Sequence, residues 1–238
     1  MNQTHQAIVI STIRYKDNSF ICRMFMEHHG LKTFIVQAPK SGKNSRTNLL
    51  QPLNLVEFEA AIRENVQIHR LKDLRIAKPL PEIYFNPVKS TMVIFIDEIL
   101  SKTIPDDYVN ARLFHFLWEA LVMLDDAIDE RNFHLWCLLE ISRHYGFYPY
   151  QESETPEFFD LHTAAFVNQP PPHAAFLAGD HAKALFELLD KPWYQVQPVS
   201  LHSSIRKALL EALVQFLKLH LDNLKEIKSL AILHQVFH

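Results

Sequence analysis

The sequence has few of the residues on which several common kinds of functional site depend. Its 238 residues include 4 glycines and 2 cysteines. Four glycines are too few for the glycine-rich turn with which a dinucleotide-binding fold approaches a pyrophosphate. Around Gly42 and Lys43 a phosphate-binding loop is excluded as well. Gln37 stands where this motif needs its first glycine, and Asn44 stands where it needs serine or threonine.

Metal ligands in a useful spacing are also missing. Cys22 and Cys137 lie far apart among hydrophobic neighbours, so we expect free, buried thiols and no zinc pair. The 14 histidines do not replace them. His234 and His238 have helical i, i+4 spacing, but Gln235 stands where a zinc protease would have glutamate. No metal and no other cofactor is therefore expected.

Long hydrophobic runs are absent too. The apolar run at residues 92–96 ends at Asp97 and Glu98, far short of the roughly 20 residues that a membrane span needs. The N-terminal segment has no basic stretch followed by a long apolar one, so no signal peptide is expected. These features predict a cytoplasmic protein without a membrane partner.

Motifs of catalysis are scarce. Adjacent acids occur at residues 97–98, 106–107, 125–126 and 129–130, and paired carboxylates can hold the metal ions of a nuclease. Such pairs near helix ends more often cap the helix or face solvent. No nucleophile elbow is present. We therefore expect a protein that is not an enzyme and has no small-molecule substrate, with a metal-dependent nuclease as an alternative.

Charge is divided unevenly along the chain. Residues 1–80 hold 12 lysines and arginines against 6 acids, a net charge of +6. Residues 81–238 hold 12 basic residues against 21 acids, a net charge of −9. This asymmetry indicates a first part that binds a polyanion and a second part with other partners, with chance clustering as the alternative.

The first third has the residue pattern of β-strands. In residues 20–26, for example, Phe20, Cys22, Met24 and Met26 share one face of the expected strand. Five short strands with a long basic loop between the third and fourth predict a barrel of the OB type, with an SH3-like barrel as the nearest alternative. The expected strands cover residues 7–13, 20–26, 31–38, about 52–60 and about 66–76.

Pro79 and Pro81 mark the expected domain boundary, because two prolines interrupt any regular element. Beyond them the hydrophobic residues recur with the period of an α-helix. Gly146 is expected to cap the C-terminus of one helix. The expected helices cover residues 90–103, 111–127, 132–145, 180–189, 203–221 and 226–237.

One stretch of the helical part has no clear period. Residues 147–177 are rich in proline and are expected to form an irregular insertion, with a short hairpin at 158–167. The predicted fold is thus α+β. An N-terminal five-stranded OB-fold barrel at residues 1–80 binds nucleic acid and is followed by an all-α helical domain at residues 81–238.

Basic residues beside aromatic ones indicate how the barrel could bind nucleic acid. Arg23 and Phe25 share the expected outer face of the second strand, and Lys32 and Phe34 share a face of the third. A cation there can meet a phosphate, and a ring can accept a stacked base. Burial of both rings in the core is an equal alternative. The predicted DNA-binding cations are Arg14, Arg23, Lys32, Lys40, Lys43, Arg46, Arg70, Lys72 and Arg75.

Several segments, taken in order, resemble the bacterial recombination mediator family RecO over essentially the full chain. The resemblance implies an N-terminal OB-fold followed by a helical domain. The matching residues are AIVISTIRY at 7–15, EHHGL at 27–31, LQPLN at 50–54, FHL at 133–135, RHYGFYP at 143–149 and a final stretch at 220–233.

The resemblance also implies a function in recombinational repair. Members of this family bind single- and double-stranded DNA, anneal complementary strands and pair with RecR. With RecR they help to load the recombinase RecA onto strands coated by single-stranded DNA-binding protein, whose acidic C-terminal tail they can bind. A protein-interaction adaptor whose barrel binds peptides is the alternative function.

A tail of that kind needs a hydrophobic groove rimmed by cations. The helical part is the expected place for it. The candidate tail-docking residues, chosen by charge alone, are Arg112, Arg131, Arg143 and Lys207.

One segment departs from the family pattern. Many members carry a four-cysteine zinc module after a Gly-Tyr-x-Pro segment, whereas residues 150–160 contain no cysteine. No zinc is therefore expected, and packing around Phe158, Phe159 and Leu161 must replace it. In this respect the chain resembles the zinc-less members of the Bacteroidetes, which implies a bacterial cytoplasm and association with the nucleoid.

Overall fold

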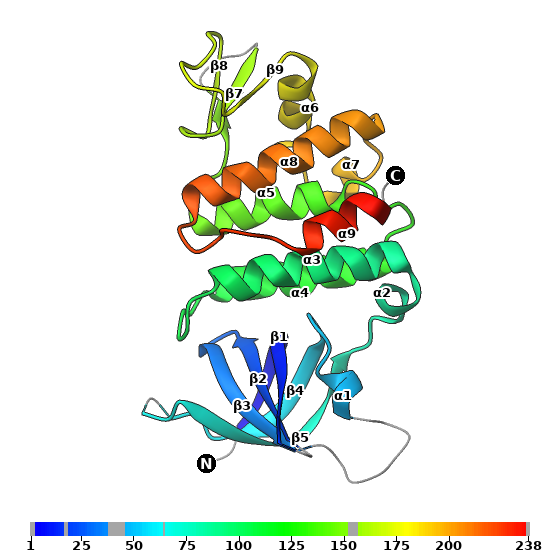
Figure 1. Cartoon of the computed structure of the whole chain (residues 1–238). Helices are drawn as coiled ribbons and strands as arrows, with labels where there is room; N and C mark the ends of the chain where they lie inside the picture. The colour runs from blue at the N-terminus through cyan, green and yellow to red at the C-terminus, as the bar shows by residue number, and fades with distance from the viewer. Residues whose placement is uncertain (1–2, 17–18, 38–45, 64, 152–156, 237–238) are drawn as a thin grey trace. The chain divides into compact units, whose positions relative to one another are not determined.

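The computed structural model describes residues 3–16, 19–37, 46–63, 65–151 and 157–236 (Figure 1). The chain divides into two compact units, Met1–Asp126 and Ala127–His238, and each is described by itself. None of the helices in these residues combines the length and the hydropathy of a membrane span.

The first unit contains a closed five-stranded barrel (Figure 1). Going around it, the strand order is β1-β2-β3-β5-β4, with β4 paired to β1. Only the β3–β5 pair is parallel. This confirms the predicted OB-type barrel. The strands are β1 (Gln3–Lys16), β2 (Ser19–Met26), β3 (Gly30–Gln37), β4 (Leu55–Ala60) and β5 (Ile68–Lys78).

Alternate side chains of the strands fill the barrel. Cys22 and Met24 of β2 and Phe34 of β3 are fully buried there. The ring of Phe34 lies 4.9 Å from that of Phe58, centroid to centroid, in an edge-on arrangement. Cys22 is a free thiol, as predicted, and burial raises its pKa to about 12.

Helices cover one side of this barrel. Helix α3 packs against β1 and α4 against β2, so that Ile8, on the opposite side of β1 from the barrel core, is also fully buried. The side chain of Asn86 caps α3 by accepting hydrogen bonds from the backbone of Val88 and Lys89. The expected boundary at Pro79 and Pro81 falls inside this compact unit. Its helices are α1 (Arg46–Leu49), α2 (Pro81–Phe85), α3 (Pro87–Thr103) and α4 (Ala111–Asp126).

The second unit is mostly helical. Helix α8 packs against both α5 and α6. Gly146 ends α5 with a φ of +88° and donates hydrogen bonds to the carbonyl groups of Ser142 and Arg143, as predicted for a C-cap. The helices are α5 (Phe133–Tyr145), α6 (Asp180–Leu188), α7 (Trp193–Val196), α8 (Ser203–His220) and α9 (Ser229–Val236).

A four-stranded sheet in the order β6-β8-β7-β9 is formed by short segments of the stretch expected to be irregular. The predicted hairpin at 158–167 is its β7–β8 pair. The description of this part as all-α is therefore wrong at this sheet. Phe159 packs against Phe166 and Phe216, with ring centroids 4.7 and 5.6 Å away, so aromatic packing holds the sheet. The strands are β6 (Tyr150–Gln151), β7 (Phe158–Asp160), β8 (Ala165–Val167) and β9 (Phe176–Ala178).

Candidate nucleic-acid interface

A row of apolar side chains crosses the outer surface of the barrel and ends on a cation. The strand register pairs Ile13 with Ile21, Ile21 with Ile35, and Ile35 with Arg70. Their neighbours Cys22 and Phe34 are buried in the barrel core, and side chains alternate along a strand, so this row faces outward. Ile13 is 61% exposed.

Further exposed side chains extend this row. Tyr15 is 52% exposed and Ile68 is 49% exposed. The Lys16 ammonium nitrogen lies 5.3 Å from the centroid of the Tyr15 ring, within the range of a cation–π contact. We call this surface the open face, and it consists of Ile13, Tyr15, Lys16, Ile21, Ile35, Ile68 and Arg70.

A groove of about 830 Å³ borders the open face. Ile35, Ile68 and Arg70 belong to both, and the β4–β5 connection and strand β5 form most of the walls of the groove. Its charged groups are mixed but carry an excess of one positive charge. They are Arg63, Arg70 and Lys72 against Glu59 and Asp73.

Phe25 and Phe34, the two phenylalanines predicted to stack on bases, are both fully buried. The prediction of base stacking is therefore wrong, and the alternative, burial in the core, is correct. Phe34 pairs with Cys22 across the β2–β3 ladder and therefore points into the barrel. Phe25 is on the outer side of β2, as expected, but α4 covers it. Its ring lies 6.1 Å from that of Phe114, centroid to centroid.

Two predicted DNA-binding cations lie at the loop between α3 and α4. The Arg23 guanidinium is 2.7 Å from the Asp106 carboxylate and also donates to the backbone carbonyl of Ser101 at 3.4 Å. Lys32 forms an ion pair with the Asp107 carboxylate. Both cations are therefore engaged within the first unit.

The other predicted cations have different environments. Arg75 is paired with Glu57 on the neighbouring strand. Arg14, Arg70 and Lys72 are exposed. Arg70 and Lys72 form no ion pair with the residues that the structure describes. Lys40, Lys43 and the side chain of Arg46 lie outside the described residues, so their part in a DNA site stays a prediction.

The apolar members of the open face were not predicted from the sequence. The isoleucines are far apart in the sequence, and only the register of three strands brings three of them into one row. Tyr15 and Lys16 could have been predicted as binding residues, because here too an aromatic residue lies near a cation, as with Arg23 and Phe25.

Two histidines of the barrel are close neighbours. The rings of His5 and His29 are 5.2 Å apart, centroid to centroid. Partial burial lowers the pKa of both, and each is lowered further by other nearby histidines. Both are therefore mainly neutral at pH 7. Within the described residues, no three His, Cys, Asp or Glu side chains come together in a way that could hold a metal ion.

The tail-docking candidates lie in different places. Arg112 is in α4 of the first unit. In the second unit, Arg143 pairs with Asp190, and its guanidinium lies 3.5 Å from the centroid of the Tyr148 ring. Lys207 lines a small pocket together with His134, Ser203, Arg206, Leu210, Leu233 and His234.

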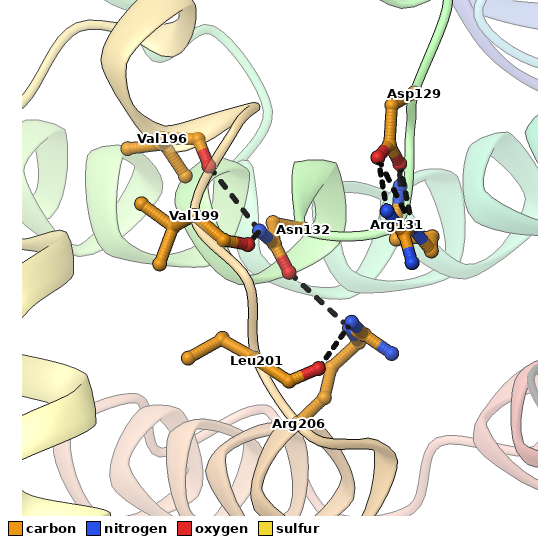
Figure 2. A network of polar contacts seen from close by, with 7 residues as sticks. All are labelled: Asp129, Arg131, Asn132, Val196, Val199, Leu201 and Arg206. Atoms are coloured by element: carbon orange, nitrogen blue, oxygen red, sulfur yellow. Dashed lines mark hydrogen bonds and ion pairs between the residues drawn. The ribbon is translucent and has the colours of Figure 1, made fainter.

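A polar network fixes Arg206 at this pocket (Figure 2). Asn132 donates to the backbone carbonyl groups of Val196 and Val199, and its own amide oxygen accepts a hydrogen bond from Arg206 at 3.2 Å. Arg206 also donates to the Leu201 carbonyl at 2.9 Å. These acceptors are neutral, so none of them forms an ion pair with the buried guanidinium, and the nearby Asp129 carboxylate offsets its charge only through space. Arg206 was not among the residues predicted from the sequence.

The fourth candidate, Arg131, lies beside this network (Figure 2). Its guanidinium Nε donates to both oxygens of the Asp129 carboxylate, at 2.9 and 3.1 Å. This hydrogen bonding lowers the pKa of Asp129. Burial lowers the pKa of Arg206, and the nearby Arg131 lowers it further.

Fold and surface together define a two-part protein with an OB-type barrel whose outer surface is apolar and basic. Comparison with known proteins assigns both parts. The family description "Recombination protein O N terminal" matches residues 1–80, and "Recombination protein O C terminal" matches residues 85–231. The chain belongs to the Recombination protein O (RecO) family.

Curated relatives support this membership along the whole chain. A "DNA repair protein RecO" of Flavobacterium psychrophilum is 37% identical over 98% of both chains. Proteins of the same name are 34% identical in Flavobacterium johnsoniae, over 98% of both chains, and 31% identical in Bacteroides fragilis, over 100% of both. The resemblance to RecO is confirmed, and it assigns the chain to DNA repair and recombination.

Proposed function

We propose that this chain is a mediator of recombinational repair in the bacterial cytoplasm, at the nucleoid. It binds single- and double-stranded DNA through the open face and anneals complementary strands. With RecR it helps to load RecA onto strands coated by single-stranded DNA-binding protein. The observation that carries the DNA-binding proposal is the outward-facing row of apolar side chains that ends on Arg70 and borders a groove with an excess of one positive charge. Membership in the RecO family supports the function in repair.

The chemistry of the open face suits an unpaired strand. Bases can lie against Tyr15 and the isoleucines, because every base has an apolar face and stacking tolerates any sequence. The phosphates then meet Lys16, Arg70 and Lys72. Cations that neutralise two strands at once reduce their mutual repulsion, so annealing needs no covalent step.

Salt dependence tests this proposal. The affinity of the full chain for an unstructured single-stranded oligonucleotide should fall linearly on a log–log plot against salt, with a slope of about −0.7 for each phosphate contacted. Annealing of complementary oligonucleotides should fall over the same range of salt. If no binding occurs at low salt in a gel-shift assay, the alternative of a peptide-binding adaptor is favoured.

We further propose that the small pocket beside Lys207 receives the acidic C-terminal tail of single-stranded DNA-binding protein. Arg206 supports this, because its positive charge has only neutral hydrogen-bond acceptors there and can pair with a carboxylate. Leu210 and Leu233 supply an apolar wall. The pocket volume is about 10 Å³, so an apolar side chain can enter only if these leucines move.

Titration of a tail peptide against the full chain tests the docking site. Lys207→Ala should weaken binding, while Lys218→Ala, an exposed lysine on the same helix, is the matched control and should leave it unchanged. Equal affinities of the two variants would place the tail elsewhere, for example at Arg112 or Arg143.

A further inference from the structure

The loop between α3 and α4 is held against the barrel by its backbone. The amide of Asp107 donates a hydrogen bond to the carbonyl of Leu31 at 3.2 Å, and Asp106 forms a parallel β-bridge with the same residue. At Gly30 an added Cβ would lie 2.5 Å from the carbonyl oxygen of Tyr108, so the first position of β3 needs glycine. This backbone anchoring places the two consecutive acids at fixed positions on the barrel surface.

From these positions the two acids reach two cations of the barrel. Asp106 pairs with Arg23 at 2.7 Å, and Asp107 pairs with Lys32. The side chains of the acids are 74% and 72% exposed, whereas those of Arg23 and Lys32 are 30% and 15% exposed. The carboxylates therefore cover the cations from the solvent side, where a phosphate would approach.

This acidic pair is continuous with the open face. A groove of about 390 Å³ is lined by Lys32, both acids and Ile68, and Ile68 belongs to the open face. Arg23 also lies on the same side of β2 as Ile21 of the open face, because the two are two residues apart on one strand. A strand that follows the open face past Ile68 would thus meet Asp106 and Asp107 before it could reach the two cations.

We propose that Asp106 and Asp107 act as an internal mimic of two backbone phosphates, which occupies Arg23 and Lys32 and limits how much of the barrel a DNA strand can use. This inference rests on the proposed function, since it concerns regulation of the same site. The carboxylate side of each pair is largely exposed to solvent, which weakens the attraction, so an incoming strand or a partner protein can displace the two acids. Displacement would add two phosphate contacts to the open face.

Removal of the two negative charges tests the mimic. The variant Asp106→Asn with Asp107→Asn keeps the size of both side chains, and asparagine tolerates the positive φ of 60° at position 107. Its affinity for oligo-dT should rise about three- to thirtyfold in the full chain. The slope of log affinity against log salt concentration should become steeper by about 1.4, which corresponds to two additional phosphates on a single strand.

A matched control separates this mechanism from a general change in charge. Glu119→Gln with Asp126→Asn raises the net charge equally, and both residues are exposed on α4. A double-mutant cycle then tests whether the effect acts through Arg23 and Lys32. Arg23→Ala with Lys32→Ala should change affinity less than twofold in the otherwise unchanged chain, but should abolish the gain of the double asparagine variant.

The outcomes are distinguishable. If the unchanged chain shows no salt-dependent DNA binding, the proposed function fails. If the chain binds DNA but the double asparagine variant gains no more than the control, only the phosphate mimic is overturned. Thermal unfolding checks the fold of each variant. Should the double variant unfold, Asp106→Asn alone decides the question, because it frees Arg23 and leaves Asp107 in place, and about half of the increase in steepness is then expected.

Discussion

The two sides of the barrel carry similar residue types in different settings. On the covered side, α4 packs over Phe25, and the acids of the α3–α4 loop pair with Arg23 and Lys32. On the open face, Tyr15 is exposed, and Arg70 forms no ion pair with any described residue. The alternation of a strand determines which side chains point outward. Whether they meet solvent depends on helices that come later in the chain.

The largest expected difference between the sides is in stability. Phe25→Ala should lower the free energy of unfolding by about 3–5 kcal/mol, because it empties a fully buried site between β2 and α4. Ile13→Ala on the open face should change it by no more than about 0.5 kcal/mol. Urea unfolding of the full chain measures both. A loss below about 1 kcal/mol for Phe25→Ala would mean that α4 does not cover this strand.

DNA affinity should show the opposite order. Tyr15→Ala should cost about 1–3 kcal/mol of binding free energy for a single strand, the usual contribution of one stacked base, with little change in stability. Tyr194→Ala removes an exposed tyrosine of the second unit, 70% exposed against 52% for Tyr15, and is the control. Fluorescence anisotropy with oligo-dT compares them. Equal affinities for both variants would contradict stacking on the open face.

A smaller effect is expected from a covered histidine in the second unit. Burial lowers the pKa of His134 to about 3, so below pH 6.5 the unfolded chain binds a proton there that the folded protein does not. The free energy of unfolding should therefore fall as the pH falls, by up to about 2 kcal/mol between pH 6.5 and 5. His134→Gln should flatten this dependence, as followed by thermal unfolding. An unchanged pH profile would show that His134 is accessible to protons in the folded state.

Much of the fold could be predicted from the sequence. The barrel strands are long enough to show alternation, and the helices at Pro87–Thr103 and Ala111–Asp126 show a helical period over at least four turns. The sheet of the second unit could not be predicted, because its strands have only two or three residues each. Aromatic contacts such as that between Phe159 and Phe166, far from any periodic signal, hold it together.

The site was less predictable than the fold. Arg70 and Lys72 were found by charge and lie in the open groove. The direction of the Phe34 side chain was predicted wrongly. It depends on the register between β2 and β3, which places Phe34 opposite Cys22. Phe25 was placed on the correct side of its strand, but no local pattern shows that α4, nearly 90 residues later, will cover it.

The most direct test of the central claim, that DNA strands bind the open face and its groove, is the salt dependence of oligo-dT binding by Arg70→Ala with Lys72→Ala. The matched control is Lys183→Ala with Lys218→Ala, which removes two exposed lysines of the second unit. The first variant alone should lose roughly tenfold in affinity for oligo-dT at low salt. The steepness of its salt dependence should also fall by about 1.4. Equal affinity and equal steepness for the two variants would contradict the central claim.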